Sequence, residues 1–258
     1  DAAVEAANTA FISEEWRGLT ATARGKMVKK FGKVLLDHAE KLATIEVRDN
    51  GKLYTEVINQ CRYMTEWFEY FGGLADKVEG AVPPIDKPKV LNYTRYEPLG
   101  VCACITPWNS PLLLLVWKLA PALAAGNTVV IKPSEYTSAS TLELAKLSEL
   151  AGFPPGVINV VTGYSSEVGE PLVSHKKVRK VAFTGGEEGG RNVNISAAAD
   201  FKKVTLELGG KSANIVFDDA DLDQAVDGAI SGIFAASGQT CIAGSRLLLQ
   251  DTIYDEFL

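Results

Sequence analysis

Two motifs frame the stretch that decides the fold: ELGGKS at residues 207–212 and GQTCIAGSR at residues 238–246. Between them lie a short apolar run, an acidic turn with Asp219 as the expected N-cap, and a helix. The apolar residues of this helix recur at helical spacing along one stripe: Leu222, Ala225, Val226, Ala229, Ile230, Ile233 and Phe234. A strand–helix passage of this length can fold back, so we expect Glu207 and Cys241 to approach one another.

The composition is that of a globular protein with a substantial core. Of 258 residues, 47% are hydrophobic and 22% are charged, with a net charge of −6. The acidic balance and the lack of a Lys/Arg cluster argue against a nucleic-acid partner. The longest apolar run, residues 112–117, is too short to span a bilayer, so we expect no membrane partner either.

The four cysteines do not have the spacing of a metal site or a disulfide framework. Cys102 and Cys104 lie in a strand-like run, where they face the same side with poor geometry for a bridge. Cys61 lies on the apolar stripe of a helix. The sequence therefore predicts three buried free thiols, as in a reducing cytoplasm, and no metal site.

The first hundred residues are predicted to be mainly helical. A helix over residues 1–11 begins at the first residue, which suggests that the natural N-terminus is missing. One helix is expected over residues 20–50, with Thr20 or Thr22 as its N-cap, and another over residues 55–71 that ends at the glycine pair Gly72-Gly73. A Pro-rich turn and an extended segment up to Pro98 follow, which we interpret as an exposed pair of strands whose edge needs a partner.

From residue 100 onward, strands and helices alternate. Strands are expected over 101–105, 128–131, 157–161 and 178–183, and helices over 112–125, 139–150 and 191–199. This alternation predicts an α/β fold with a Rossmann-like parallel sheet and helices on both faces. The polar motifs follow the strand ends, where such sheets bind ligands: Thr106, Pro107, Trp108 and Asn109; Lys132, Ser134 and Glu135; Gly163; Thr184, Gly185 and Gly186.

The two framing motifs, in their order and separation, resemble the NAD(P)-dependent aldehyde dehydrogenase superfamily. The resemblance covers the whole chain but suggests a fragment that lacks the N-terminal start and the C-terminal half. It implies a cofactor-binding domain of residues 1–79 and 99–208, an oligomerisation arm of residues 80–98, and a partial catalytic domain of residues 209–258. It further implies a cytoplasmic homodimer or homotetramer that acts on a small-molecule aldehyde.

The resemblance also implies three catalytic roles. The Cys241 thiolate would attack the aldehyde to give a hemithioacetal and later a thioester. The Asn109 amide and the Cys241 backbone N–H would stabilise the oxyanion. Glu207 would activate the hydrolytic water. As a hypothesis from the residues themselves, the leucines beside Glu207 would form a partly apolar niche that raises its pKa.

NAD is the cofactor that the resemblance implies. Lys132 and Glu135 would bind the adenine ribose, and the Glu135 carboxylate would disfavour the 2′-phosphate of NADP. No G-x-G-x-x-G motif is present, so the pyrophosphate is expected at the turn after Phe183 and the following helix start. Many members have Ser where this chain has Gly186, which would weaken phosphate contact. The other expected cofactor contacts are Thr106, Pro107, Trp108, Ser134, Gly163, Thr184, Gly185, Leu208 and Gly209.

Two other functions stay open. CoA-acylating semialdehyde dehydrogenases share the fold but generally lack the general-base carboxylate, so Glu207 argues against them. A truncated NAD-binding fragment without turnover is the second alternative, because much of the catalytic domain lies beyond residue 258. These residues do not identify the aldehyde substrate.

Overall fold

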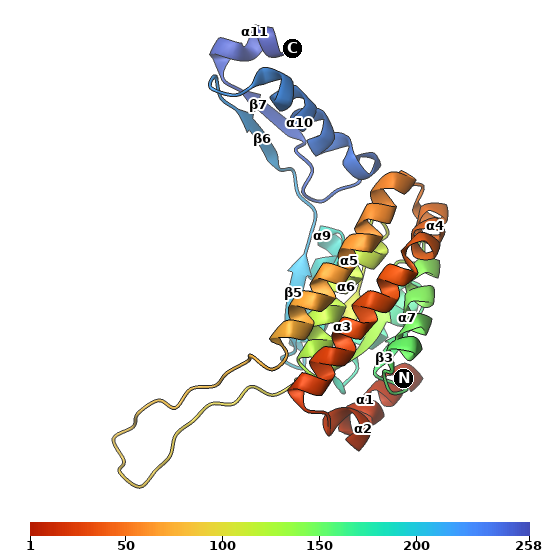
Figure 1. The fold of residues 1–258 in the computed structure, drawn as a ribbon, viewed down its shortest axis with the longest axis vertical. Helices are drawn as coiled ribbons and strands as arrows, with labels where there is room; N and C mark the ends of the chain where they lie inside the picture. Colours follow the sequence, from red (N-terminus) through yellow and green to blue (C-terminus); the bar gives the residue numbers. More distant parts are fainter.

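The computed structural model describes residues 1–258 and contains a five-stranded, fully parallel sheet with the order β3-β2-β1-β4-β5 (Figure 1). Its strands are β1 (Val101–Ile105), β2 (Thr128–Lys132), β3 (Ile158–Val160), β4 (Val178–Thr184) and β5 (Lys203–Glu207). The predicted Rossmann-like sheet is therefore confirmed, with strand ends that differ from the expected ones by no more than a residue or two.

Helices cover both faces of this sheet. They are α1 (Ala2–Ile12), α2 (Glu14–Arg17), α3 (Ala21–Asp37), α4 (Ala39–Asn50), α5 (Tyr54–Leu74), α6 (Pro111–Ala124), α7 (Ala139–Ala151), α8 (Glu170–Ser174) and α9 (Glu187–Ala198), with a short π-helix over Ser165–Gly169. Strand β1 shows why both faces are apolar. Cys102 and Cys104 contribute to the core beneath α3, α5, α6 and α7, whereas Val101, Ala103 and Ile105 contribute to a second core beneath α1, α8 and α9.

The three expected buried thiols are free and buried. Burial raises the pKa of Cys61 to about 12, that of Cys102 to about 11 and that of Cys104 to about 12. A thiol with so high a pKa is almost wholly protonated at neutral pH, so these three cysteines are poor nucleophiles.

Three helix boundaries differ from the predictions. The segment predicted as one helix over residues 20–50 is two helices, separated at His38, although Thr20 does cap α3 by accepting a hydrogen bond from the Ala23 N–H. Helix α5 passes through Gly72 instead of ending there, and α9 begins before Arg191. The reason at Gly72 is packing: a Cβ there would lie 2.8 Å from the Gly25 carbonyl oxygen, so the glycine permits close contact with α3.

The segment between α5 and β1 contains no helix or strand and extends away from the body of the molecule (Figure 1). The predicted pair of strands is therefore not formed. Its two sides meet where the Thr94 N–H donates to the Ala81 carbonyl oxygen over 2.8 Å, where the Ala81 N–H donates to Thr94 Oγ1 over 2.9 Å, and where Asn92 Nδ2 donates to the Pro83 carbonyl oxygen over 3.4 Å. An isolated two-stranded ribbon without a packed face is marginal, which explains its extended form in a single chain.

After β5 the chain forms a second, smaller unit, which lies apart from the main sheet in Figure 1. It comprises β6 (Ala213–Val216), α10 (Leu222–Phe234), β7 (Arg246–Leu249) and α11 (Tyr254–Phe257), and β6 pairs in parallel with β7. The N-cap of α10 is Asp221, which accepts the Gln224 N–H at 3.1 Å, and not Asp219 as predicted. No residue of α10 is buried, so its apolar stripe is only partly covered. That residues 209–258 begin a catalytic domain stays a prediction.

None of the helices has the length and apolarity that a bilayer crossing requires.

Candidate active site

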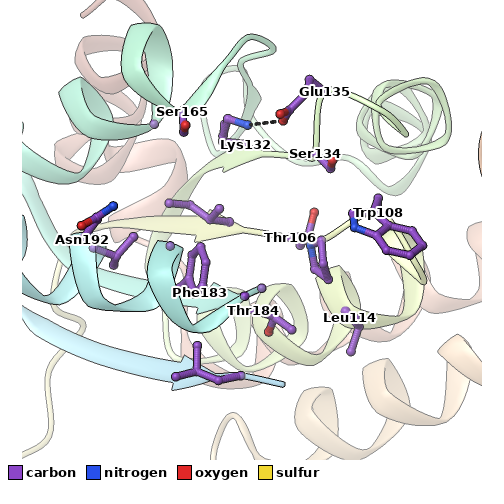
Figure 2. Close-up of a pocket in the computed structure, with 18 of the residues that line it drawn as sticks. Thr106, Trp108, Leu114, Lys132, Ser134, Glu135, Ser165, Phe183, Thr184 and Asn192 are labelled. Carbon is purple, nitrogen blue, oxygen red and sulfur yellow. Dashed lines mark hydrogen bonds and ion pairs between the residues drawn. The ribbon is translucent and has the colours of Figure 1, made fainter. Parts of the chain in front are cut away.

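A cavity of about 970 Å³ lies at the carboxyl edge of the main sheet (Figure 2). All but two of the predicted site residues line it: Thr106, Pro107, Trp108, Asn109, Lys132, Ser134, Glu135, Thr184, Gly185, Gly186, Leu208, Gly209 and Cys241. They come from the segments that follow β1, β2, β4 and β5 and from the loop that contains the thiol. Glu207 and Gly163 do not line the cavity. The sheet topology thus gathers polar groups that are far apart in the sequence, as the strand-end rule predicts.

The thiol loop, residues 235–241, lies against the turn that contains Asn109. The Asn109 Nδ2 donates a hydrogen bond to the Gln239 carbonyl oxygen at 2.6 Å, and the half-buried Cys241 follows two residues later. The first framing motif also touches this loop, because a Cβ on Gly210 would lie 2.9 Å from the Cys241 carbonyl oxygen. The two motifs therefore lie against one another at Gly210 and Cys241, whereas the approach of Glu207 itself to Cys241 stays a prediction.

Two residues of the thiol loop have a left-handed backbone. Ala236 has a φ of 53° and Ser237 a φ of 58°. For an L-residue other than glycine this conformation costs on the order of 1–2 kcal/mol. Contacts with the rest of the molecule must therefore hold this loop in place.

Glu207 ends β5, and its side chain is exposed. The partly apolar niche proposed for it is not formed. Neighbours at i−1 and i+1 in a strand point to the opposite face, so Leu206 and Leu208 do not surround the carboxylate. Leu208 instead packs against α9, where a Cβ on Gly190 would lie 2.5 Å from its Cδ2.

A preformed ion pair lies at one side of the cavity. The buried Lys132 places its Nζ 3.3 Å from Glu135 Oε2 and 3.1 Å from the Pro133 carbonyl oxygen (Figure 2). Glu135 is exposed at the cavity wall, and Ser134 Oγ accepts a hydrogen bond from the Tyr136 N–H at 3.4 Å. The pair therefore presents an ammonium and a carboxylate side by side, which suits a ligand with paired hydroxyl groups.

The turn between β4 and α9 brings a helix N-terminus to the cavity. Its backbone N–H groups have no partner within the helix and are suited to bind an anion. Gly185 is required here, because a Cβ would lie 2.6 Å from the Phe183 ring, whereas a Cβ at Gly186 would meet open space. Gly163 has a φ of 147° and turns the chain outside the cavity, where a Cβ would lie 2.5 Å from Val168 Cγ2.

Lys118, which was not among the predicted site residues, lies beneath the cavity wall. Its Nζ donates to Thr184 Oγ1 at 2.5 Å and to the Leu114 carbonyl oxygen at 3.4 Å, and burial lowers its pKa. Lys118 is the only charged residue of the apolar helix α6. A single charge in such a helix is a sequence feature that could have marked it as a candidate site residue. Other cavity residues gave no such signal: Tyr136, Ser165, Ser166 and Asn192.

A doubly wound parallel sheet whose carboxyl edge carries a half-buried thiol beside a side-chain amide defines an α/β protein with a candidate covalent nucleophile. The family model described as the aldehyde dehydrogenase family matches residues 1–258. The chain therefore belongs to the aldehyde dehydrogenase family.

Individual relatives agree with this membership. The chain is 49% identical over 256 residues to a (Z)-2-((N-methylformamido)methylene)-5-hydroxybutyrolactone dehydrogenase of Acinetobacter baylyi, covering 99% of this chain and 52% of the relative. It is 46% identical to human aldehyde dehydrogenase 1A1, covering 100% and 52%. The chain thus spans about half the length of these curated relatives.

Solved structures give the same result. An NAD+ complex of betaine aldehyde dehydrogenase from Staphylococcus aureus superposes with a TM-score of 0.96 at 45% identity, covering 99% of this chain and 51% of that one. An NAD+ complex of aldehyde dehydrogenase from Bacillus cereus gives a TM-score of 0.96 at 43% identity, covering 100% and 52%.

Proposed function

We propose that the protein that contains this chain oxidises an aldehyde to a carboxylic acid with NAD. The observation that carries this proposal is the hydrogen bond from the Asn109 amide to the thiol loop, which brings Cys241 and Asn109 to one cavity. The same cavity contains the Lys132–Glu135 pair and the start of α9. Cofactor contacts and a candidate nucleophile therefore share one space.

In the first half of the proposed reaction, the Cys241 thiolate attacks the aldehyde carbon and forms a C–S bond. The carbonyl oxygen becomes an oxyanion, and the Asn109 amide and the Cys241 backbone N–H stabilise it by donating hydrogen bonds. Bound NAD would supply the acceptor for the hydride that leaves this carbon. The product on the enzyme is a thioester of Cys241.

In the second half, Glu207 accepts a proton from the water that attacks the thioester carbon. The C–S bond breaks, the carboxylic acid leaves, and the thiolate is restored. Solvent reaches the exposed Glu207 carboxylate directly. Three residues further on, Gly210 contacts the Cys241 carbonyl oxygen, which supports a position of this motif beside the thioester.

The cavity residues suit NAD. Lys132 and Glu135 offer a donor and an acceptor to the two hydroxyls of the adenine ribose, and the N-terminus of α9 offers N–H groups to the pyrophosphate. An exposed carboxylate at Glu135 would repel a 2′-phosphate, which favours NAD over NADP. The open space at Gly186 leaves room for the phosphate without the hydroxyl that many relatives have there.

The function is tested by measuring NADH formation at 340 nm in the intact natural protein with a panel of aldehydes. We expect turnover that requires aldehyde and NAD and is not increased by CoA. Turnover that requires CoA would favour the CoA-acylating alternative. Binding of NAD with no NADH formed from any aldehyde would favour the alternative without turnover.

Replacing Asn109 with alanine is expected to lower kcat by about 10²–10³-fold, because one oxyanion donor is lost. Leu142→Ala, an exposed change on α7 away from the cavity, is the matched control and should leave kcat unchanged. Steady-state NADH formation measures both variants. Unchanged turnover of the Asn109 variant would rule out the oxyanion role.

We also propose that residues 80–98 form an arm that contacts another subunit of a homodimer or homotetramer. The arm leaves large apolar side chains exposed: Val82, Val90, Leu91, Tyr93 and Tyr96. We expect the double change Leu91→Arg and Tyr96→Arg to lower the solution mass measured by light scattering. A mass equal to that of the unaltered protein would contradict this role.

A further inference from the structure

Helix α5 makes a direct contact with the thiol loop that the proposed mechanism does not use. Glu56, in the first turn of α5, accepts a hydrogen bond at Oε2 from the Ala236 N–H at 2.9 Å. The two residues are 180 positions apart in the sequence. Ala236 is the first of the two left-handed residues of the loop, so the carboxylate holds the chain where its backbone is strained.

The same corner of the structure also holds the turn that contains Asn109. We call residues 46–60 the α4–α5 corner. The Lys52 ammonium is fully buried there and donates to Glu46 Oε1 at 3.2 Å and to Ser110 Oγ at 2.8 Å. Next to Ser110, the Asn109 carbonyl oxygen accepts a hydrogen bond from Asn50 Nδ2 at 3.3 Å.

A second set of contacts makes this corner rigid. Lys52 Nζ also donates to Gln60 Oε1 at 2.9 Å, and Glu46 Oε2 accepts the Leu112 N–H at 3.3 Å. The Lys52 and Glu46 side chains are 0% and 2% exposed, so water does not compete for these bonds. The corner is therefore a stiff support that contacts both the Asn109 turn and the thiol loop.

We infer that Glu56 is a positioning residue that sets the distance between the Cys241 thiol and the Asn109 amide. This inference rests on the proposed function, in which both groups act on the same carbonyl. On one side, Asn50 and Lys52 hold the Asn109 turn. On the other side, Glu56 holds the loop that leads to Cys241, through a hydrogen bond strengthened by the carboxylate charge. Without Glu56, the Asn109–Gln239 hydrogen bond remains to join the loop to the Asn109 turn.

The test compares Glu56→Ala, Glu56→Gln and the control Glu66→Ala in the intact natural protein. Glu66 lies on the same helix, is exposed and makes no ion pair, so its loss removes an equal charge without touching the loop. A displacement of about 1 Å can cost about 10²-fold in rate, so we expect Glu56→Ala to lower kcat by about 10–100-fold. The Kd for NAD and the unfolding midpoint should stay unchanged. Glutamine keeps an acceptor oxygen and should restore most of kcat, and Glu66→Ala should behave as the unaltered protein.

A double-mutant cycle with Asn109→Ala separates positioning from a general structural effect. Asn109 both donates to the oxyanion and holds the loop through Gln239, so a positioning role predicts that the two losses do not combine independently: the kcat of the double variant should differ by more than about threefold from the product of the two single losses. Equal losses in both backgrounds would overturn the inference. So would an unaltered kcat in Glu56→Ala, or a glutamine variant as slow as the alanine variant.

Amide hydrogen exchange tests the positioning role of Glu56 independently of the proposed function. If the unaltered protein forms no NADH from any aldehyde, the proposed function fails, and exchange then decides the positioning role alone. We expect the amides of residues 236–239 to exchange at least about tenfold faster in Glu56→Ala than in Glu56→Gln or the unaltered protein, because the Ala236 N–H loses its acceptor. Equal exchange in all three proteins would overturn the inference.

Discussion

Replacing Cys241 with serine is expected to lower aldehyde-dependent NADH formation by at least about 10⁴-fold, the scale seen when a covalent nucleophile is lost. A serine hydroxyl is far less acidic than a thiol and has no base within the thiol loop to activate it. The Kd for NAD, measured by calorimetry, should not change, because the ribose and phosphate contacts lie on other segments of the cavity. The Cys241→Ser variant should therefore lose activity but keep its affinity for NAD.

The matched control is Cys102→Ala, which removes a buried thiol of β1 that does not line the cavity. Its kcat should equal that of the unaltered protein. Of the four cysteines of this chain, iodoacetamide near pH 8 should modify only Cys241, because the other three thiols are buried and their pKa values are raised to about 11–12. Substantial turnover in Cys241→Ser would exclude the covalent mechanism.

Replacing Glu207 with glutamine is expected to lower steady-state kcat by about 10²–10⁴-fold, the usual contribution of a general base. Glutamine has nearly the shape of glutamate but cannot accept the proton of the hydrolytic water. Formation of the thioester does not need this base. A rapid burst of about one NADH per active site should therefore persist, followed by very slow turnover. Stopped-flow absorbance and the intact mass of the acylated protein measure the two phases.

Glu149→Gln makes the same change on the exposed end of α7 and should leave both phases unaltered. Loss of the burst in Glu207→Gln would show that Glu207 acts before the thioester forms. An undiminished kcat would instead assign the water activation to another group.

The regular part of the fold could be predicted from the sequence because it depends on local patterns. Residues 101–105 form β1 with the predicted ends, and Thr20 caps α3 as expected, since strand alternation and capping involve neighbours along the chain. The cavity could be located for a related reason: parallel strands bring their carboxyl ends to one edge, so residues such as Lys132 and Thr184 meet there whatever their distance in sequence.

The errors share a physical cause, since each depends on what a residue meets across the fold. Gly72 was predicted to end its helix, because glycine often follows the last helical residue. In the structure it lies within α5 against α3, and its small size allows these two helices to pack closely. Leu206 and Leu208 are adjacent to Glu207 in the chain but point to the opposite face of β5. The segment up to Pro98 has a strand-like pattern, but no neighbouring strand is present to complete a sheet.

By itself, the sequence of this protein determined the family, the α/β architecture, the edge of the sheet where the cavity lies and the identity of the candidate nucleophile. These follow from motifs and periodicities carried by contiguous residues. Only the tertiary structure showed that Lys118 supports the cavity wall, that the buried Lys52 donates to Ser110, and that Glu56 holds the thiol loop. Hydrogen bonds between groups 58 to 180 residues apart leave no periodic trace in a sequence, because their geometry exists only once the chain has folded.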